Sequence, residues 1–530
     1  MSPWIATAPE RLRGPVRGRL KVAAFFQTSQ LRLRRPRKVY TQPVNEPVAN
    51  PFPVVGVGAS AGGLEPLSQL LEGLSSQRGL AVVVVQHLDP HYESQLSSIL
   101  QTHTPLRVLD AMHGQKVEPD HVYVIQPNTQ VAIADGVLSV TARPDKRQPH
   151  YPVDHFLRSL ATVQGPHAAG VILSGTGSDG TLGIGEIKAA GGLTFAQDDA
   201  SAQYPDMPRN AVASGAVDLV LPPREIGARL ATLPQDPYLT SGADERLPAS
   251  VDTSDQFPRV LAALQKMSGV DFTQYRDTTI RRRTARRMLL RGFRTAADYA
   301  QFVERDRAEA EALFRDVLIN VTSFFRDPEM FEDLKRDVFP QIANNGADGT
   351  AIRVWVPGCS TGQEAYSVAI ALVEYLEDIR SQRAIQIFAT DLGDAASLER
   401  ARVGVYPESI EVDIGPERLR RFFVKEERTY RIIQSVRDMC VFARQNVAVD
   451  PPFSHVDLIT FRNVLIYMSA PLQERLLPVF HFALNRGGYL VLGDAETVGS
   501  SSDLFELTNR HQDLSPKRRS HPTAADLHVR

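Results

Sequence analysis

The stretch 53–67, "PVVGVGASAGGLEPL", passes from an apolar run through a glycine-rich turn into a segment with leucines at helical spacing. This order predicts a buried parallel strand, a tight turn and a helix, which is the repeating unit of an α/β sheet. The turn fits two incompatible patterns. Read from Gly56, it matches the G-x-G-x-x-A fingerprint of a dinucleotide site; read from Gly58, it matches the G-x-S-x-G elbow that presents a nucleophile, here Ser60.

The next apolar run, 79–90, discriminates between these two patterns. A dinucleotide site needs an acid at the end of the second strand to hold a ribose hydroxyl. Here the strand ends in Gln86 and His87, and the first acid, Asp89, lies beyond it. A histidine at that position is suited instead to act as the general base for a serine on the preceding turn.

A third strand, glycine loop and helix at 168–192 complete the set, because the loop carries Asp179 to the same carboxyl edge of the sheet. Ser60, His87 and Asp179 are therefore predicted to form a triad. In such a triad the serine attacks, the imidazole takes its proton and the carboxylate fixes the imidazole tautomer. Backbone amides after Ser60, with those near Thr176 as a second source, are candidate donors to an oxyanion.

Composition restricts the class of protein further. The 530 residues carry a net charge of −2 and only two cysteines, which argues against a disulfide framework, a zinc site and bulk affinity for nucleic acid. No apolar run approaches the ~20 residues of a membrane-spanning helix, and we find no secretory signal. We therefore expect a cytoplasmic protein with no transmembrane segment, no bound metal and no specific nucleic-acid partner. The first 39 residues hold ten Lys/Arg and one acid, which predicts a disordered basic arm.

The first block resembles the catalytic domain of the chemotaxis receptor methylesterase family (CheB-type). The resemblance rests on "GVGASAGGLEPL", "VVVQHLDP", "VILSGTGSDGTLG" and "AQDDASAQYPDMPRNAVASGAVDLVLP". It implies that Ser60 is the nucleophile, His87 the base and Asp179 the acid in the hydrolysis of γ-methyl esters on receptor glutamates, with deamidation of some glutamines. The residues before Pro51 are too few for a phosphorylatable receiver domain, so we expect an esterase that is active without phosphorylation.

The second block begins with an arginine-rich helix within 271–293. Its predicted packed face holds Ile280, Ala285, Met288 and Leu289. Its predicted basic face holds Arg281, Arg282, Arg283, Arg286 and Arg287. A solvated face is one interpretation of this pattern, and docking to an acidic protein surface is the other.

Strands and helices alternate again from 352. The segment 351–372 predicts a strand, a glycine turn and a helix, and it lacks the lysine of a phosphate-binding loop. The following strand, within 385–397, ends in Asp391, where a carboxylate can take both ribose hydroxyls of an adenosine cofactor. S-adenosylmethionine fits this pattern, because it has no pyrophosphate to bind.

This block resembles the chemotaxis receptor glutamate methyltransferase family (CheR-type), through "NVTSFFRD", "GCSTGQEAYS", "ATDL" and "FRNVLIYM". The resemblance implies S-adenosylmethionine as cofactor and a tyrosine, Tyr467, near the reacting methyl. It implies cofactor contacts at Asn320, Thr322, Arg326, Glu364, Asp391, Asn446, Val447, Arg462 and Asn463. It also matches the basic helix to a receptor-docking helix, with arginines at Arg283, Arg286 and Arg287.

These patterns predict a multidomain α/β fold with two enzyme blocks. The expected order is a disordered arm (1–50), a Rossmann-like parallel-sheet methylesterase domain (51–233), a linker (234–255), a small all-α domain (256–345), an S-adenosylmethionine-binding α/β domain with a small inserted β-subdomain near 422–442 (346–512) and a disordered tail (513–530). The predicted function is a bifunctional chemosensory enzyme that methylates and demethylates cytoplasmic helices of a chemoreceptor, with a histidine kinase or response regulator as a further partner. Two alternatives stay open: a serine hydrolase fused to a small-molecule methyltransferase, and a receptor-binding scaffold with a vestigial site.

Overall fold

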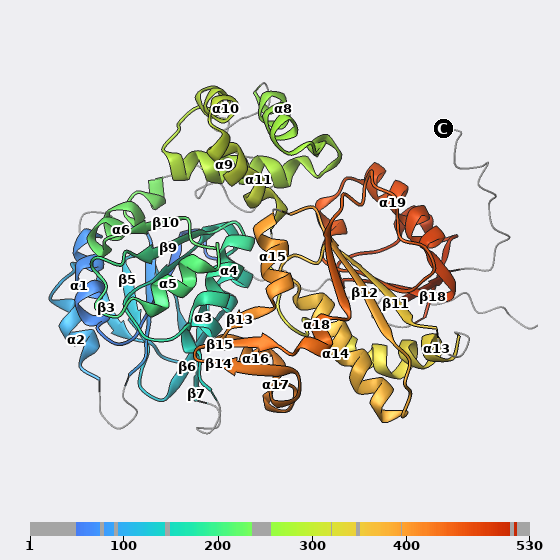
Figure 1. Cartoon of the computed structure of the whole chain (residues 1–530). Coiled ribbons are helices and arrows are strands. Elements are labelled where there is room, and N and C mark those ends of the chain that lie inside the picture. Colours follow the sequence, from blue (N-terminus) through green and yellow to red (C-terminus); the bar gives the residue numbers. More distant parts are fainter. Residues whose placement is uncertain are drawn as a thin grey trace, which may run out of the picture. The chain divides into compact units, whose positions relative to one another are not determined.

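The computed structural model of the chain (Figure 1) describes residues 49–74, 79–88, 94–143, 149–235, 256–319, 321–345, 350–393, 395–508 and 513–516. All of these fall within one compact unit, 47–530. Nearly all of the predicted arm, most of the predicted linker and most of the predicted tail lie outside the described residues. None of the described helices combines the length and the apolar character that crossing a lipid bilayer requires.

The first α/β domain, 49–235, is built on a seven-stranded parallel sheet with the order β10-β9-β8-β1-β2-β5-β3. The strands are β1 (Val54–Ala59), β2 (Ala81–Gln86), β3 (Arg107–Asp110), β5 (His121–Val124), β8 (Ala168–Ile172), β9 (Leu193–Gln197) and β10 (Leu219–Leu221). Helices α1 (Leu64–Gly73), α2 (Leu96–Gln101) and α6 (Pro223–Leu230) pack on one face, and α3 (Pro152–Gln164), α4 (Thr181–Ala189) and α5 (Asp206–Ala213) pack on the other. Helices on both faces explain why β1 is apolar and buried along its whole length.

The two glycines of β1 let helix α3 pack directly on the strand. A Cβ added to Gly56 would lie 2.5 Å from Leu157 Cδ2, and one added to Gly58 would lie 2.3 Å from Val153 Cγ1. Real Cβ atoms do not approach other atoms so closely, so the helix fills the space that a side chain would need. These glycines therefore serve helix packing, which leaves the serine elbow as the interpretation of the turn that the structure favours.

The same domain contains a second, three-stranded sheet with the order β4-β7-β6. Its strands are β4 (Gln115–Lys116), β6 (Thr129–Ala134) and β7 (Val137–Ala142). Asp135 and Gly136 connect β6 to β7, and their φ angles of 49° and 74° are both positive. This backbone is the tight hairpin turn that the Asp-Gly pair favours.

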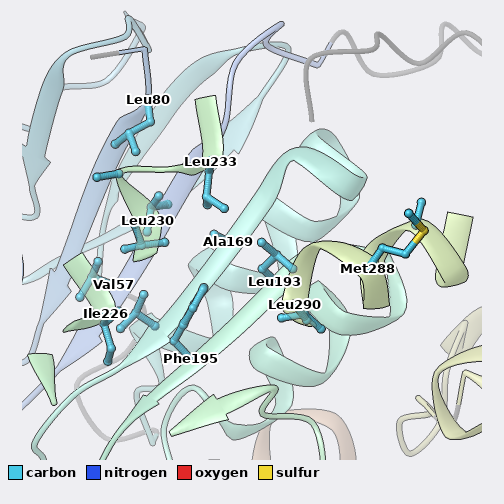
Figure 2. Close-up of a cluster of buried hydrophobic side chains, with 14 of the residues drawn as sticks. Val57, Leu80, Ala169, Leu193, Phe195, Ile226, Leu230, Leu233, Met288 and Leu290 are labelled. Carbon is cyan, nitrogen blue, oxygen red and sulfur yellow. The ribbon is translucent and has the colours of Figure 1, made fainter. Parts of the chain in front are cut away.

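The helical domain contains α8 (Phe257–Ser268), α9 (Asp277–Arg291), α10 (Ala296–Arg305) and α11 (Arg307–Leu318). Its core is continuous with one face of the first α/β domain. Figure 2 shows Leu193 of β9 beside Leu290 of α9, and Met288 belongs to the same buried cluster as Val57 of β1. The helical domain thus packs its apolar side chains on the first α/β domain.

The second α/β domain has a seven-stranded sheet with the order β16-β12-β11-β17-β18-β20-β19. Its strands are β11 (Ile352–Pro357), β12 (Ile385–Asp391), β16 (Cys440–Arg444), β17 (Val456–Phe461), β18 (Leu484–Leu492), β19 (Phe505–Leu507) and β20 (Asp513–Pro516). The first five strands are parallel to one another, and β20 runs antiparallel to its neighbours β18 and β19. Helix α14 (Gln363–Asp378) packs on one face and α19 (Ala470–Ala483) on the other, while α15 (Ala395–Val403) follows β12.

Three boundaries differ from the sequence prediction. Strand β20 lies within the segment predicted as a disordered tail, so the second α/β domain continues past 512. Helices α12 (Pro328–Asp333) and α13 (Phe339–Asn344) pack in the core of the second α/β domain, so the helical domain ends near 319 rather than at 345. The inserted β-subdomain, β13 (Val405–Pro407), β14 (Phe423–Glu426) and β15 (Thr429–Ile432), begins earlier than the predicted 422. Its first strand is only three residues long, which is too short for an alternating pattern to reveal.

Candidate active sites

Ser60 lies on the turn between β1 and α1, as the elbow pattern predicts. Its backbone N–H donates to the carbonyl of Ser174 (3.0 Å), and its own carbonyl accepts from Gly63 N–H (3.0 Å), so the turn is held from both sides. Gly62 has a φ of 67°, in the left-handed region that favours glycine. A Cβ on Gly175 would lie 2.8 Å from Ser60 Cβ, so this glycine leaves room for the serine.

The structure brings Ser60, His87 and Asp179 together at the carboxyl edge of the sheet. His87 Nδ1 lies 3.4 Å from Ser60 Oγ, and His87 Nε2 lies 2.7 Å from Asp179 Oδ2. A proton on Nε2 that is donated to the carboxylate leaves a lone pair on Nδ1 facing the serine hydroxyl. This tautomer is the one that a general base acting on Ser60 requires.

Helix α3 fixes the carboxylate of this trio. The backbone N–H groups of Val153 and Asp154, at the first turn of α3, donate to Asp179 Oδ2 (3.1 Å) and Oδ1 (2.8 Å). Asp179 is only 2% exposed, so these bonds satisfy a charge that has little access to water. A helix N-terminus also carries partial positive charge, which stabilises the ionised acid.

A cavity of about 210 Å³ opens beside His87. Gln86, Gln126, Arg143 and His150 are among the side chains that line it. Burial lowers the pKa of His150, and the charge of Arg143 lowers it further, so His150 is neutral at neutral pH. The cavity has both polar and apolar walls and adjoins the base.

A second cavity, of about 130 Å³, lies at the carboxyl edge of the second α/β sheet. It collects nearly all of the residues that the sequence assigned to a cofactor. The lining includes Thr322, Arg326, Glu364, Asp391, Asn446, Val447, Arg462, Asn463 and Tyr467. Asn320 lies outside the described residues.

Asp391 ends β12 and is held by the loop that follows β11. Its Oδ2 accepts the N–H of Ser360 (2.7 Å), and its Oδ1 accepts the N–H of Gly393 (2.6 Å). These two backbone bonds orient the carboxylate at the end of the strand.

Arg462 connects three walls of this cavity. Its Nη1 donates to both oxygens of Glu364 (3.1 and 2.9 Å), and its Nη2 donates to Asp327 Oδ2 (2.6 Å) and to the carbonyl of Arg326 (2.9 Å). Asp327 precedes Pro328 at the start of α12, in the N-cap position. Its carboxylate, however, binds Arg462 instead of capping the helix.

The backbone around the second cavity is strained, and several buried polar atoms there lack a hydrogen-bond partner among the described residues. Phe325, Asp327, Ser360 and Asn463 all have positive φ, between 47° and 58°, which is costly for residues other than glycine and is typical of ligand sites. Ser360 Oγ, Thr460 Oγ1, Gln445 Oε1 and Arg462 Nε are buried without a hydrogen-bond partner among the described residues. Unsatisfied donors and acceptors beside Asp391 fit a polar ligand such as S-adenosylmethionine.

The sequence analysis missed Glu496, which follows β18 and is 3% exposed. Its carboxylate accepts the N–H groups of Asn463 (2.8 Å), Val464 (2.8 Å), Gly493 (2.8 Å) and Ile466 (3.3 Å). It thereby holds the turn that carries Asn463 and Tyr467. No motif marks this position, because its partners are backbone groups.

Replacing Glu496 with alanine should weaken the binding of S-adenosylhomocysteine. The change leaves four N–H groups without their acceptor, and hydrogen bonds to a charged group contribute about 1.5–3 kcal/mol each. We expect the Kd to rise roughly tenfold or more, measured by isothermal titration calorimetry. Glu506→Ala, which removes an exposed glutamate nearby in the sequence, is the matched control and should bind normally. An unchanged Kd for Glu496→Ala would contradict a role in shaping the cavity.

The arginine helix α9 differs from the prediction. Ile280, Ala285 and Met288 are buried as expected, but so are Arg283, Arg286 and Arg287, with exposed fractions of 5%, 0% and 8%. The expectation of an open basic face at these three positions is therefore wrong. Arg281 is half-buried, and Arg282 is exposed.

The reason is that acids from distant parts of the sequence lie against the helix. Arg287 donates to both oxygens of Glu309 (2.8 and 2.7 Å). Arg286 binds Asp316 (2.7 Å) and also pairs with Asp218 of the first α/β domain. Charge-assisted pairs of this kind let arginine be buried. The pKa of Asp316 is lowered: burial acts to raise it, but the charges of Arg286 and its neighbours outweigh that effect.

Comparison with known families gives three matches along the chain. Residues 55–230 match the CheB methylesterase, 255–318 match the all-alpha domain of the CheR methyltransferase, and 320–513 match the SAM binding domain of the CheR methyltransferase. The two α/β domains and the helical domain of the fold coincide with these three segments.

Individual relatives divide in the same way. An uncharacterised 104.1 kDa protein of Rhodobacter capsulatus is 35% identical over 437 residues, or 79% of this chain and 46% of that protein, so the chain spans about half the length of this relative. A chemotaxis protein methyltransferase of Listeria innocua is 30% identical over 44% of this chain and 87% of its own length. A protein-glutamate methylesterase/protein-glutamine glutaminase of Burkholderia lata is 36% identical over 36% of this chain and 54% of its own length.

Proposed function

The chain belongs to the CheB methylesterase family in its first α/β domain and to the CheR methyltransferase family in the remainder, and we propose that it both adds and removes methyl esters on glutamate side chains of a chemoreceptor. One observation carries this proposal. The same chain pairs Ser60, His87 and Asp179 in one domain and surrounds Asp391 with a polar cavity in another. The two sites have opposite chemistry on the same kind of side chain.

In the methylesterase domain, Ser60 Oγ attacks the ester carbonyl while His87 Nδ1 takes its proton. The ionised Asp179 stabilises the imidazolium that forms, and helix α3 holds that carboxylate in place. Backbone amides after Ser60 would donate to the oxyanion. His87 then gives its proton to the leaving methoxide, methanol departs, and water releases the glutamate by the same steps in reverse.

In the methyltransferase domain, Asp391 would hold the ribose of S-adenosylmethionine, because its carboxylate ends β12 at the cavity and is oriented there by two backbone N–H groups. When bound, this cofactor supplies an electrophilic methyl group. Thr322, Arg326, Glu364, Asn446, Val447, Arg462 and Asn463 would provide further contacts, and Tyr467 would border the reacting centre. A glutamate carboxylate is already a nucleophile at neutral pH, so the protein contributes position and a dry site rather than a general base.

The proposed substrate is a helix of the cytoplasmic part of a chemoreceptor, and the proposed location of the enzyme is the cytoplasm. The exposed Arg282 and the cavity beside His87, which Arg143 lines, are surfaces that an acidic helix could meet. A chemosensory histidine kinase or response regulator is a further proposed partner.

A direct test combines a receptor cytoplasmic fragment with methyl-labelled S-adenosylmethionine and the purified protein. Label should first appear on receptor glutamates, identified by mass spectrometry, and then leave as volatile methanol. A protein that binds S-adenosylhomocysteine but labels neither receptor nor any other protein would contradict the proposal.

Asp391→Ala should prevent the labelling by weakening cofactor binding. Loss of charge-assisted hydrogen bonds worth about 1.5–3 kcal/mol corresponds to a roughly 10- to 150-fold higher Kd for S-adenosylhomocysteine in calorimetry. Asp378→Ala, an exposed position at the end of α14, is the control and should bind as the unmodified protein does. Equal affinity of the two variants would move the cofactor site away from β12.

A further inference from the structure

Helix α4 of the methylesterase domain lies against the methyltransferase part of the chain. Arg283 of α9 donates to the carbonyl of Lys188 (2.7 Å) and also to that of Ala189, at the C-terminal end of α4. Lys188 in turn pairs with Asp316 of α11 (3.5 Å). Bonds to carbonyls that a helix leaves open fix the end of that helix.

The middle of α4 reaches the rim of the cofactor cavity. A Cβ built on Gly185 would lie 3.9 Å from Val321 Cγ2, an ordinary van der Waals contact, and Val321 is one of the residues that line the cavity around Asp391. Glycine at 185 thus brings the helix backbone close to the segment that carries Thr322 and Arg326.

The next residue along the helix is Glu186, whose side chain is half-buried. Burial raises the pKa of its carboxyl, and the charges of Arg158 and Arg326 oppose that effect. Glu186 is also among the charges that act on Tyr467, whose own pKa is raised first of all by burial. Arg326 and Tyr467 both line the cofactor cavity, so the Glu186 carboxylate lies within electrostatic range of the place assigned to methyl transfer.

We propose that Glu186 is a methylation site of the chain itself, presented by α4 to the methyltransferase cavity as a helical glutamate. This proposal rests on the proposed function, since it assigns a second substrate to the same site. The substrate class matches, because Glu186 carries a γ-carboxylate on a helix. A tethered glutamate at the rim would also compete with a receptor glutamate for the same space.

The chemistry requires no added reagent beyond S-adenosylmethionine. One carboxylate oxygen of Glu186 forms a bond to the methyl carbon, while the carbon–sulfur bond breaks and its electron pair remains on sulfur. The products are the γ-methyl ester of Glu186 and S-adenosylhomocysteine, and no proton changes hands when the carboxyl is ionised. Because burial raises its pKa, labelling should increase with pH as the carboxyl ionises.

The first test incubates the Ser60→Ala chain with methyl-labelled S-adenosylmethionine in the absence of receptor. Loss of Ser60 protects an ester from hydrolysis, so label should accumulate on the peptide that contains Glu186 and be released by alkali. Glu186→Gln in the same background should lower labelling at least tenfold. Glu225→Gln, which removes an exposed glutamate of α6, is the matched control and should label fully. The labelled fraction should not change on dilution, because α4 and the cavity belong to one chain.

A binding measurement provides a readout that does not depend on turnover. Sinefungin carries a protonated amine where the cofactor carries its methyl group, whereas S-adenosylhomocysteine is uncharged there. If the Glu186 carboxylate faces that position, Glu186→Gln should weaken sinefungin about fivefold more than S-adenosylhomocysteine in calorimetry, since it removes an attraction between opposite charges.

The outcomes separate this inference from the proposed function. A chain that methylates receptor but carries no label on Glu186, or a Glu186→Gln variant that weakens both ligands equally, overturns the self-methylation site and leaves the proposed function intact. A chain that neither binds S-adenosylhomocysteine nor methylates receptor overturns both. Label on Glu186 that disappears on dilution would show transfer between chains and overturn presentation by the chain's own α4.

Discussion

Methyl-ester hydrolysis should fall by ~10⁴–10⁶ when Ser60 is replaced with alanine, while methyl transfer should be unchanged. In the proposed mechanism, Ser60 Oγ forms the bond to the ester carbonyl in the covalent intermediate. Without it the domain has no nucleophile, and His87 Nδ1 has no hydroxyl to activate. Asp391 and its cavity belong to a different sheet, so cofactor binding should not respond. The measurement follows labelled methanol released from a receptor fragment that was methylated beforehand.

The Ser60→Ala variant should also stop the cycle of methylation and demethylation after the methylation step. Supplied with receptor and labelled S-adenosylmethionine, the Ser60→Ala protein should retain label on the receptor, whereas the unmodified protein should lose it as methanol. Ser98→Ala, an exposed serine of α2, controls for the substitution itself and should behave as the unmodified protein. If Ser60→Ala releases methanol at a rate within tenfold of the unmodified protein, the assignment of Ser60 as the nucleophile is wrong.

Replacing Arg286 with alanine is expected to lower the free energy of unfolding by about 3–5 kcal/mol. Arg286 is 0% exposed and binds Asp316, Asp218 and the carbonyl of Gly192. Its removal would leave two buried carboxylates, Asp218 and Asp316, to share Lys188 at 3.2 and 3.5 Å. A buried charge that loses its main partner is far costlier than a lost surface pair. Urea titration followed by circular dichroism measures the effect.

The same helix supplies the control. Arg282→Ala removes an exposed arginine four residues before Arg286 on the chain's charged run and should change stability by no more than about 0.5 kcal/mol. Arg286→Met combined with Asp218→Asn and Asp316→Asn should recover part of the loss, because all three charges leave together. If Arg286→Ala unfolds within about 1 kcal/mol of the unmodified protein, the buried network does not stabilise the chain.

The fold class was predictable because parallel α/β sheets leave a local signature. Each buried strand is an apolar run, and the polar residue after it marks the carboxyl edge where strands meet. Ser60, His87 and Asp391 stand directly at such ends, so their neighbourhood could be inferred one strand at a time. The predicted order of an α/β domain, a helical domain and a second α/β domain is confirmed.

What escaped prediction depends on partners far away in the chain. The sequence of α9 is the same whether its arginines face water or pair with acidic side chains. The acids that pair with the buried arginines are Asp218, Glu309 and Asp316. Glu496 binds backbone groups, which have no signature in a sequence. Glu186 sits in a helix whose contact with the methyltransferase part depends on how whole domains pack, and no local pattern encodes that.

The glycines of β1 have a consequence for how mutational data on this enzyme would look. Helix α3 rests on Gly56 and Gly58, and the first turn of that helix holds Asp179. The spacing between β1 and α3 therefore sets the position of Asp179. Any side chain at 56 or 58 would push α3 outward and move Asp179 away from His87, although neither glycine belongs to the triad. In a library of random variants scored for hydrolysis, inactive clones would therefore cluster on a buried strand. A map of those clones would resemble the map of a phosphate-binding loop, although these glycines make room for a packed helix.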